Sequence, residues 1–338
     1  MRALYYPSWQ NIEVQDLPSP IPGSGEALVR VSHCGICGSE LEAFRTQNAR
    51  RRPPLIMGHE FCGHIENVNG TKSNWSGGSR VIAHALIHCG SCTACLRGDT
   101  NLCSSRQVFG MHRPGGFAEY IAVPERVLIP WPETMSGAIA VFAEPLANGI
   151  NAMRQGPNAR KSRVVVIGAG PIGLMCVLAA KHIHKSTVIA SDLVPERLEA
   201  ARIVGADITV HATKQNLANT VRDSWPNDGA EFVIDAVGSS ETKRLSLELV
   251  QPGGMVVWIG LHQDQMSLNS YVLTLGQKSI SGSYSGSMQD LLDATKLLDS
   301  GILNTSWVTQ YPLEHGEVGF RHMLLGKGHH IKGVLDCS

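Results

Sequence analysis

The chain has 338 residues, about twice the length of a typical domain, so two domains are expected. Hydrophobic residues make up 43% and charged residues 17% of it, and 29 basic side chains balance 29 acidic ones. This balance excludes a polyelectrolyte surface and argues against nucleic acid or a membrane as partner. The N-terminus lacks the basic start and apolar core of a secretory signal, which predicts a cytoplasmic protein with reduced cysteines.

The first part of the chain, residues 1–147, is predicted to be a β-rich domain. Short alternating segments such as EALVRVSHC and AEYIAVP are interrupted often by glycine and proline. Such a pattern is typical of many short strands. Two pieces of this region, CGICGSE at 34–40 and LIMGHEFCGH at 55–64, place cysteine, histidine and glutamate beside glycines that allow close backbone approach. Each piece alone is a weak signal for a metal site.

Four cysteines occupy one loop of this region, about residues 86–106. Cys89, Cys92, Cys95 and Cys103 follow a C-x2-C-x2-C-x7-C spacing, which suits a tetrahedral zinc ion. An iron–sulfur cluster fits less well, because the bacterial spacing ends in C-x3-C-P. Unrelated buried thiols fit poorly too, since the loop is polar. Four ligands leave no open position, so the sequence predicts a structural zinc here.

Residues 148–289 are predicted to form an α/β domain with a doubly wound parallel sheet of the Rossmann type. Strand-like segments such as VVVIGAG, TVIASD and FVIDAVG alternate with helical segments such as PERLEAARIVGA. The apolar stretch 163–180 is long enough for a membrane span, but its spaced glycines favour a buried strand, a turn and a core helix. One further helix and strand-like pieces in residues 290–338 indicate a return to the first domain.

The motif GAGPIG at 168–173 follows a strand and opens a helix, the context of a dinucleotide-binding turn. Asp192 stands at about the 20-residue offset of the acid that binds the ribose hydroxyls, so NAD is favoured over NADP. Arg197, about one helical turn after Asp192, is expected to stack on the adenine or to face water. The predicted cofactor-binding residues are Gly168, Gly170, Pro171, Ile172, Gly173, Asp192 and Arg197.

Six features of the sequence follow one another in this order: GICGS, GHE, the four-cysteine loop, GGFAEY, AEPLA and GAGPIG. In these features and their order the chain resembles the zinc-dependent medium-chain dehydrogenases, in their sorbitol and threonine dehydrogenase branch. The resemblance covers essentially the whole chain. It implies a GroES-like catalytic domain, a Rossmann NAD domain and two zinc ions per chain, one structural and one catalytic. It also implies a homo-oligomer, a tetramer or a dimer.

The resemblance also implies the residues of the catalytic site. Cys37 and His59 would bind the catalytic zinc, and Glu60 and Glu144 are both candidates for a further ligand. Ser39 would pass on the proton of the substrate hydroxyl. An open position on the metal is what a catalytic zinc needs.

Two departures from the family pattern bear on the mechanism and the substrate. Glu40 and Glu42 stand where the family usually has aspartate and histidine, which leaves the route of the proton to solvent open. Ser283 precedes Tyr284 where the polyol branch tends to have an arginine, so Tyr284 is a candidate to line the substrate pocket and sorbitol itself is in doubt.

The expected activity is the reversible oxidation of a secondary alcohol to a ketone with NAD. The resemblance favours a polyol, an aldonate or a sugar-derived alcohol as substrate. L-Threonine or a simple alcohol is the alternative. Two other functions stay open: a non-catalytic zinc-binding relative and a zinc-free quinone reductase of the same fold. The possible zinc ligands Cys37, His59, Glu60 and Glu144 argue against a zinc-free protein. Ser39 argues against an inactive one.

Overall fold

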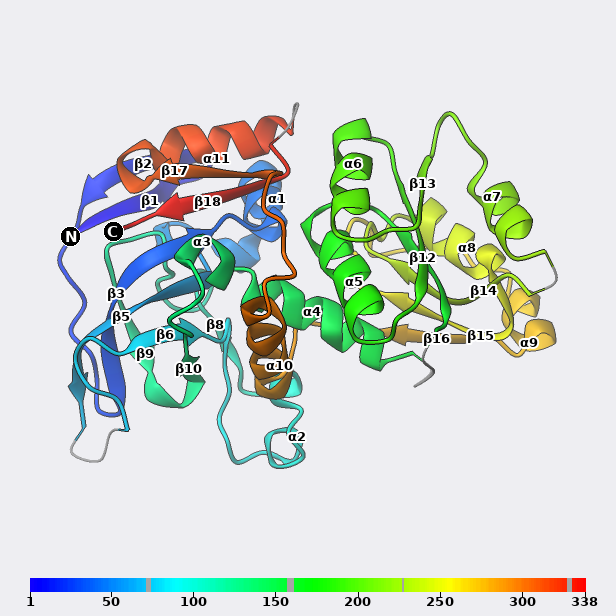
Figure 1. Ribbon diagram of the computed structural model, residues 1–338. Coiled ribbons are helices and arrows are strands. Elements are labelled where there is room, and N and C mark those ends of the chain that lie inside the picture. The colour runs from blue at the N-terminus through cyan, green and yellow to red at the C-terminus, as the bar shows by residue number, and fades with distance from the viewer. Residues whose placement is uncertain (71–73, 157–160, 227, 327–329) are drawn as a thin grey trace. The chain divides into compact units, whose positions relative to one another are not determined.

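The computed structural model describes residues 1–70, 74–156, 161–226, 228–326 and 330–338. By its contacts the chain divides into two compact units. Unit 1 comprises Met1–Glu144 together with Ser287–Ser338, and unit 2 comprises Pro145–Gly286. The mixed fold agrees with the prediction of a β-rich part and an α/β part, and each unit is seen in Figure 1.

Unit 1 is built mainly from short strands. Its strands are β1 (Arg2–Ser8), β2 (Asn11–Asp16), β3 (Glu26–Gly35), β4 (Leu55–Ile56), β5 (Glu60–Asn69), β6 (Arg80–Ala83), β7 (Leu86–Ile87), β8 (Gln107–Val108), β9 (Tyr120–Pro124), β10 (Leu128–Pro130), β17 (Val308–Pro312) and β18 (Lys332–Asp336). Its helices are α1 (Gly38–Thr46), α2 (Thr93–Leu96), α3 (Gly137–Ala140), α10 (Met288–Asp299) and α11 (Gly316–Leu325), with 3-10 turns η1 (Ala49–Arg51), η2 (Thr100–Leu102), η3 (Glu125–Val127) and η4 (Leu313–His315). Helix α4 (Ala143–Arg154) begins in unit 1 and continues into unit 2.

The main sheet of unit 1 combines strands from the first 130 residues with two strands from the C-terminal part of the chain. Its strand order is β10-β6-β5-β3-β18-β17, with β9 pairing β3 as well. The C-terminal strand β18, red in Figure 1, therefore lies between β3 and β17. Buried and less buried residues alternate over the first part of β3, as expected for a strand with one face on a core. That core includes the ring pair Phe61 and Phe109, with centroids 5.4 Å apart.

Unit 2 is a six-stranded, fully parallel sheet in the order β13-β12-β11-β14-β15-β16, the order of a dinucleotide-binding Rossmann fold. Its strands are β11 (Arg163–Ile167), β12 (Thr187–Asp192), β13 (Ile208–His211), β14 (Ala230–Asp235), β15 (Val250–Trp258) and β16 (Ser279–Gly282), and its helices are α5 (Pro171–His182), α6 (Pro195–Ile203), α7 (Leu217–Ser224), α8 (Ser240–Leu249) and α9 (Tyr271–Gly276). The predicted alternation of strand and helix is confirmed.

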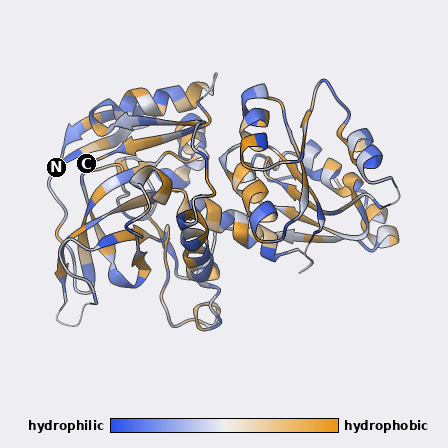
Figure 2. Ribbon diagram, in the orientation of Figure 1, coloured by the Kyte–Doolittle hydropathy of each residue, from blue (hydrophilic) through white to orange (hydrophobic). Residues whose placement is uncertain are grey.

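The apolar stretch from Arg163 to Ala180 is strand β11, a turn and most of helix α5, as predicted. None of the described helices is long and apolar enough to cross a membrane. Figure 2 shows orange and blue residues side by side along α11, which packs against β17 and β18, and this is the pattern of a helix with one face against a sheet.

Candidate metal centre and cofactor site

Strand register brings the two sequence pieces of the candidate metal centre together. Strand β3 ends at Gly35, two residues before Cys37, and β5 begins at Glu60, directly after His59. Gly35 pairs with Glu60 in the antiparallel register, so the end of one strand lies beside the start of the other. A Cβ atom on Gly35 would collide with the Glu60 carboxylate, which explains why glycine is needed at that point.

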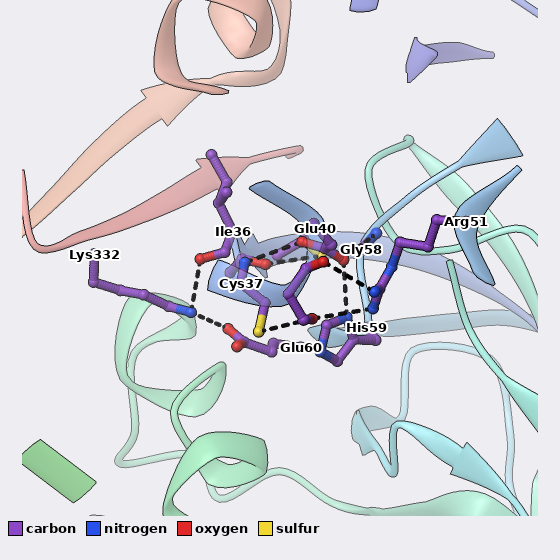
Figure 3. Close-up of polar contacts among 11 residues, drawn as sticks. Ile36, Cys37, Glu40, Arg51, Gly58, His59, Glu60 and Lys332 are labelled. Carbon is purple, nitrogen blue, oxygen red and sulfur yellow. Dashed lines mark hydrogen bonds and ion pairs between the residues drawn. The ribbon is translucent and has the colours of Figure 1, made fainter. Parts of the chain in front are cut away.

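Cys37, His59 and Glu60 form a compact donor group. One ligand atom from each lies within 4.8 Å of the others. Sulfur, imidazole nitrogen and carboxylate oxygen are the donors that zinc prefers, and three protein donors leave room for a further ligand. The chemistry and spacing of the group therefore fit a catalytic zinc. Figure 3 shows Cys37, His59 and Glu60 converging from α1 and from the start of β5.

Glu40 connects the two halves of this group. One of its carboxylate oxygens lies 2.8 Å from His59 Nδ1 and also accepts a 2.8 Å hydrogen bond from the Gly58 N–H, and the other accepts from the Cys37 N–H at 3.0 Å. Burial alone would raise the pKa of Glu40, but His59 first and Arg51 next outweigh it and lower the pKa. The bond to Nδ1 leaves His59 Nε2 for the donor group, the arrangement that orients metal-binding histidines.

Lys332 is the second buried group that holds the site. Its Nζ forms an ion pair with Glu60 and donates to the Ile36 carbonyl at 2.9 Å. The side chains of Lys332 and Glu60 are each 1% exposed. Burial alone would lower the pKa of Lys332, but Glu60 and then Cys37 outweigh it and raise the pKa. Without a metal, Lys332 therefore supplies the positive charge that compensates Glu60.

Ser39 lies next to the donor group and is exposed. Its hydroxyl donates to Cys37 Sγ at 3.3 Å and accepts from Arg51 Nη2 at 3.1 Å. Glu42, at the position of the family histidine, has a 53% exposed side chain and pairs with Arg45 at 3.6 Å. Glu42 thus faces solvent, and the partners of the Ser39 hydroxyl, Cys37 Sγ and Arg51 Nη2, are not bases of the histidine type.

Two further residues were predicted for this site, Glu144 as a ligand and Tyr284 as a pocket residue. Glu144 lies in the first turn of α4 and is 6% exposed, but among the described residues the group within 4.8 Å contains Glu60 and not Glu144. Tyr284 lies in unit 2, just after β16, and is 41% exposed. Its backbone carbonyl accepts from Asn151 Nδ2 at 3.5 Å, which holds the segment against α4.

The four cysteines of the loop between β7 and β8 form a second donor group. The ligand atoms of Cys89, Cys92, Cys95 and Cys103 lie within 4.8 Å of one another. The backbone N–H and hydroxyl of Ser91 and the N–H of Cys92 lower the pKa of Cys89 to about 5, which favours the thiolate that zinc binds. Four sulfurs around one point match a closed, structural zinc site.

Replacing Cys95 with serine is expected to remove about one zinc ion per chain, because three thiolates and a poor hydroxyl ligand bind zinc weakly. The part of the loop around α2 has little other reason to hold its shape, since Cys89 is exposed and α2 has no buried residue. Limited proteolysis should therefore cut the variant within residues 86–106. The matched control is Cys176→Ser in α5, which is fully buried far along the chain and should keep both zinc ions. Unchanged zinc content in Cys95→Ser would contradict the assignment.

The glycine turn of unit 2 has the geometry of a phosphate-binding turn. Gly168 has φ +92°, and a Cβ on Gly173 would collide with the Gly168 carbonyl, so strand and helix approach each other closely. Gly170 is the N-cap of α5 and a Cβ there would meet nothing within 4 Å, which leaves space in front of the helix N-terminus. Pro171 is the first residue of that helix and Ile172 the next. A helix N-terminus opening onto free space suits a pyrophosphate.

Asp192 ends β12 beside this turn. Its Oδ2 accepts from the Ala169 N–H at 2.7 Å and its Oδ1 from the Val194 N–H at 2.9 Å, so the carboxylate is fixed at the carboxyl end of the strand. Arg197 Nη1 lies 3.8 Å from Asp192 Oδ2. Arg197 therefore forms an ion pair with Asp192, a contact that was not expected from the sequence.

Sequence reasoning did not assign a role to Glu40, Lys332 or Arg51. The signal for Glu40 was present, since it stands at the position of the family aspartate three residues after Cys37. Lys332 is 272 positions from Glu60, so only the pairing of β18 with β3 reveals it. Arg51 lies in a run of three arginines in which no sequence feature distinguishes the buried one.

Comparisons with known proteins agree with this geometry. The family model of the alcohol dehydrogenase GroES-like domain matches residues 23–133, and that of zinc-binding dehydrogenases matches residues 171–300. An L-threonine 3-dehydrogenase of Saccharopolyspora erythraea is 30% identical over 307 residues, 89% of each chain. An alcohol dehydrogenase of E. coli CFT073 in complex with NADH has a TM-score of 0.92 at 27% identity, covering 99% of each chain. A Sinorhizobium meliloti 1021 dehydrogenase bound to NADP has a TM-score of 0.91 at 27% identity, covering 99% of this chain and 98% of that one.

Proposed function

The chain belongs to the medium-chain family of zinc-binding dehydrogenases, and from this premise we propose that it reversibly oxidises a secondary alcohol of a polar, polyhydroxylated substrate to a ketone with NAD. The observation that carries the proposal is the donor group of Cys37, His59 and Glu60, with ligand atoms within 4.8 Å of one another. These three residues would hold the catalytic zinc, and the four cysteines of the loop would hold the structural one.

Oxidation of a secondary alcohol removes a hydride from the carbinol carbon and a proton from the hydroxyl. When bound, zinc supplies the Lewis acidity that favours loss of the proton, and the nicotinamide supplies the hydride acceptor. Ser39 would take part in the movement of the proton, a role that the contact of its hydroxyl with Cys37 Sγ supports. Since Ser39 is exposed, its proton can pass directly to water, which makes the family histidine unnecessary.

Glu40 and Lys332 act on the donor group and not on the substrate. Glu40 orients His59 and fixes the backbone at Cys37 and Gly58. Lys332 holds Glu60 at the start of β5. The contacts of Glu40 are buried, so they hold His59 and the backbone at Cys37 in place before any substrate arrives, whereas the buried ion pair with Lys332 compensates the charge of Glu60 while no metal is bound.

A substrate with several hydroxyl groups is favoured by the polar surroundings of the donor group. Ser39 supplies an exposed hydroxyl beside it, and Tyr284 remains the candidate for a further pocket residue. Glu144 remains a candidate for a further ligand of the metal. L-Threonine is the second candidate substrate, because relatives with about 30% identity bear the name L-threonine 3-dehydrogenase.

A panel of alditols, aldonates, L-threonine and simple secondary alcohols, tested with NAD⁺ at 340 nm, examines the proposal. We expect about two zinc ions per chain and turnover of at least one polyhydroxylated alcohol. Turnover of L-threonine or simple alcohols alone would make the second candidate correct. About one zinc ion and no turnover would indicate a non-catalytic relative. A homo-oligomer, tetramer or dimer, stays a prediction that light scattering tests.

Preference for NAD is proposed to depend on Asp192, whose fixed carboxylate would accept hydrogen bonds from the ribose and repel a 2′-phosphate. Replacing Asp192 with asparagine keeps the shape but removes the charge. The ratio of kcat/KM for NAD⁺ over NADP⁺ should fall by about tenfold or more. Arg202→Gln in α6, the helix that follows Asp192, replaces an exposed residue paired with Glu199 at 2.7 Å and should leave the ratio unchanged. An unchanged ratio in Asp192→Asn would refute the ribose assignment.

A further inference from the structure

Arg51 is a buried cation at the edge of the candidate active site. It ends the 3-10 turn η1 and is 5% exposed, whereas its neighbours Arg50 and Arg52 are exposed. Arginine is rarely buried so completely unless it is paired. The partners of Arg51 therefore need an explanation.

Both terminal nitrogens of Arg51 bind one residue, Ser39. Nη1 donates to the Ser39 carbonyl at 3.1 Å and Nη2 donates to the Ser39 hydroxyl at 3.1 Å. The same hydroxyl contacts Cys37 Sγ at 3.3 Å, so the guanidinium is two hydrogen bonds away from a predicted metal ligand. Figure 3 shows Arg51 on the side of the group opposite to Lys332.

The positive charge of Arg51 has no carboxylate in contact. Within the described parts of the chain no ion pair up to 4.0 Å includes Arg51, and its Nε is buried without a hydrogen-bond partner. The nearest compensating acid is Glu40, which Arg51 influences electrostatically. Glu40, however, is already bound to His59 and to two backbone N–H groups.

Burying a guanidinium without a direct anionic partner is costly, and an anionic ligand that supplies the partner would offset this cost. Lys332 shows the contrast, because the same site gives its other buried cation a full ion pair with Glu60. The exposed hydroxyl of Ser39 marks the side from which a ligand can approach.

We propose that Arg51 is a specificity-determining residue that favours secondary alcohols carrying an anionic group, a carboxylate or a phosphate ester, near the carbinol carbon. The inference rests on the proposed function and narrows its substrate class from neutral polyols to secondary alcohols with an anionic group, which include aldonates, sugar phosphates and the second candidate, L-threonine. Arg51 attracts the anionic group across Ser39 and, through its two hydrogen bonds, keeps the Ser39 hydroxyl directed at the donor group. A neutral alditol makes no use of this charge.

Three six-carbon substrates of one configuration test the proposal: the alditol, its aldonate and its phosphate ester. The unmodified enzyme should prefer at least one anionic form over the alditol by about tenfold or more in kcat/KM, mainly through KM. Comparing aldonate with phosphate identifies which anion is recognised. Arg51→Gln should lose this preference, and Arg51→Lys should retain part of it because the charge remains.

The control variant is Arg52→Gln, an exposed neighbour that should keep the preference. NADH affinity and zinc content are measured for every variant. Equal use of alditol and anionic forms by the unmodified enzyme would overturn the inference. Equal losses of kcat/KM for neutral and anionic substrates in Arg51→Gln would also overturn it, because they would indicate a role in folding. A loss of NADH affinity of the same size would overturn it too, because the charge would then act on the dinucleotide.

Failure of the proposed function is distinguishable from failure of this inference. If no alcohol is turned over, calorimetric titration of the zinc-loaded protein with aldonate, phosphate ester and alditol still tests the role of Arg51. Tighter binding of either anion that is lost in Arg51→Gln supports the inference without turnover. Equal binding of neutral and anionic forms refutes it.

Discussion

Replacing Glu40 with glutamine is expected to lower zinc affinity at the catalytic site and kcat/KM by about 10- to 100-fold each. Glutamine has nearly the same shape, but it lacks the negative charge and has only one acceptor oxygen. Glutamine therefore cannot keep all three contacts of the Glu40 carboxylate, which are to His59 Nδ1, the Gly58 N–H and the Cys37 N–H. Zinc content after dialysis against a chelator and steady-state kinetics at saturating NAD⁺ measure both losses.

The control for this prediction is Glu42→Gln, two positions along the same helix, whose side chain is 53% exposed and contacts Arg45. It should retain zinc and activity. Glu40→Asp keeps the charge on a shorter side chain and should lie between the unmodified enzyme and Glu40→Gln. Full zinc retention in Glu40→Gln would mean that Cys37, His59 and Glu60 are held by the strands alone.

The strand–helix alternation of unit 2 is readable from the sequence because each buried parallel strand is a short branched apolar run bounded by glycine or a polar residue. Strand β11 and the turn at Gly168 show both signals. Strand β16 was not singled out, because SISG has only one large apolar residue and lies at the edge of the sheet. Periodicity carries little information where a strand has only one neighbour.

The candidate metal centre was predictable only as far as its donors lie in recognisable motifs. Cys37 and His59 could be named because glycines and neighbouring acids surround them in the sequence. Their relative position follows from the pairing of Gly35 with Glu60, which is a matter of register between β3 and β5. Lys332 was not predictable, because nothing local in IKGVLD distinguishes a buried lysine from a surface one.

A difference between Glu60 and Glu144 also comes from three-dimensional placement. Both follow from the same family resemblance, and both are buried. Only Glu60 falls within the 4.8 Å donor group among the described residues, since it is the first residue of β5 and is drawn toward Lys332. The spacing of these residues in the sequence does not show which glutamate lies beside Cys37 and His59, because Glu144 belongs to a helix far along the chain.

Replacing Lys332 with methionine is expected to destabilise the zinc-free protein by about 3–5 kcal/mol, because it leaves the Glu60 carboxylate buried without a cation. Urea unfolding of the zinc-free protein, followed by circular dichroism, measures the loss. The double variant with Glu60→Gln should recover most of the lost stability, since the uncompensated charge is then gone. Lys181→Met is the matched control, because its pair with Asp207 is partly exposed and should cost less than about 1 kcal/mol.

Zinc should change the outcome for Lys332→Met in a way that identifies the role of Glu60. A zinc ion held by Cys37, His59 and Glu60 supplies the positive charge that the variant has lost, so added zinc should stabilise Lys332→Met more than it stabilises the unmodified protein. In the unmodified protein Lys332 and zinc compete for the same carboxylate, and the variant should therefore also bind zinc more tightly at this site. Equal stabilisation by zinc with and without Lys332 would mean that Glu60 remains a partner of the lysine alone, and the metal would then have to take another ligand.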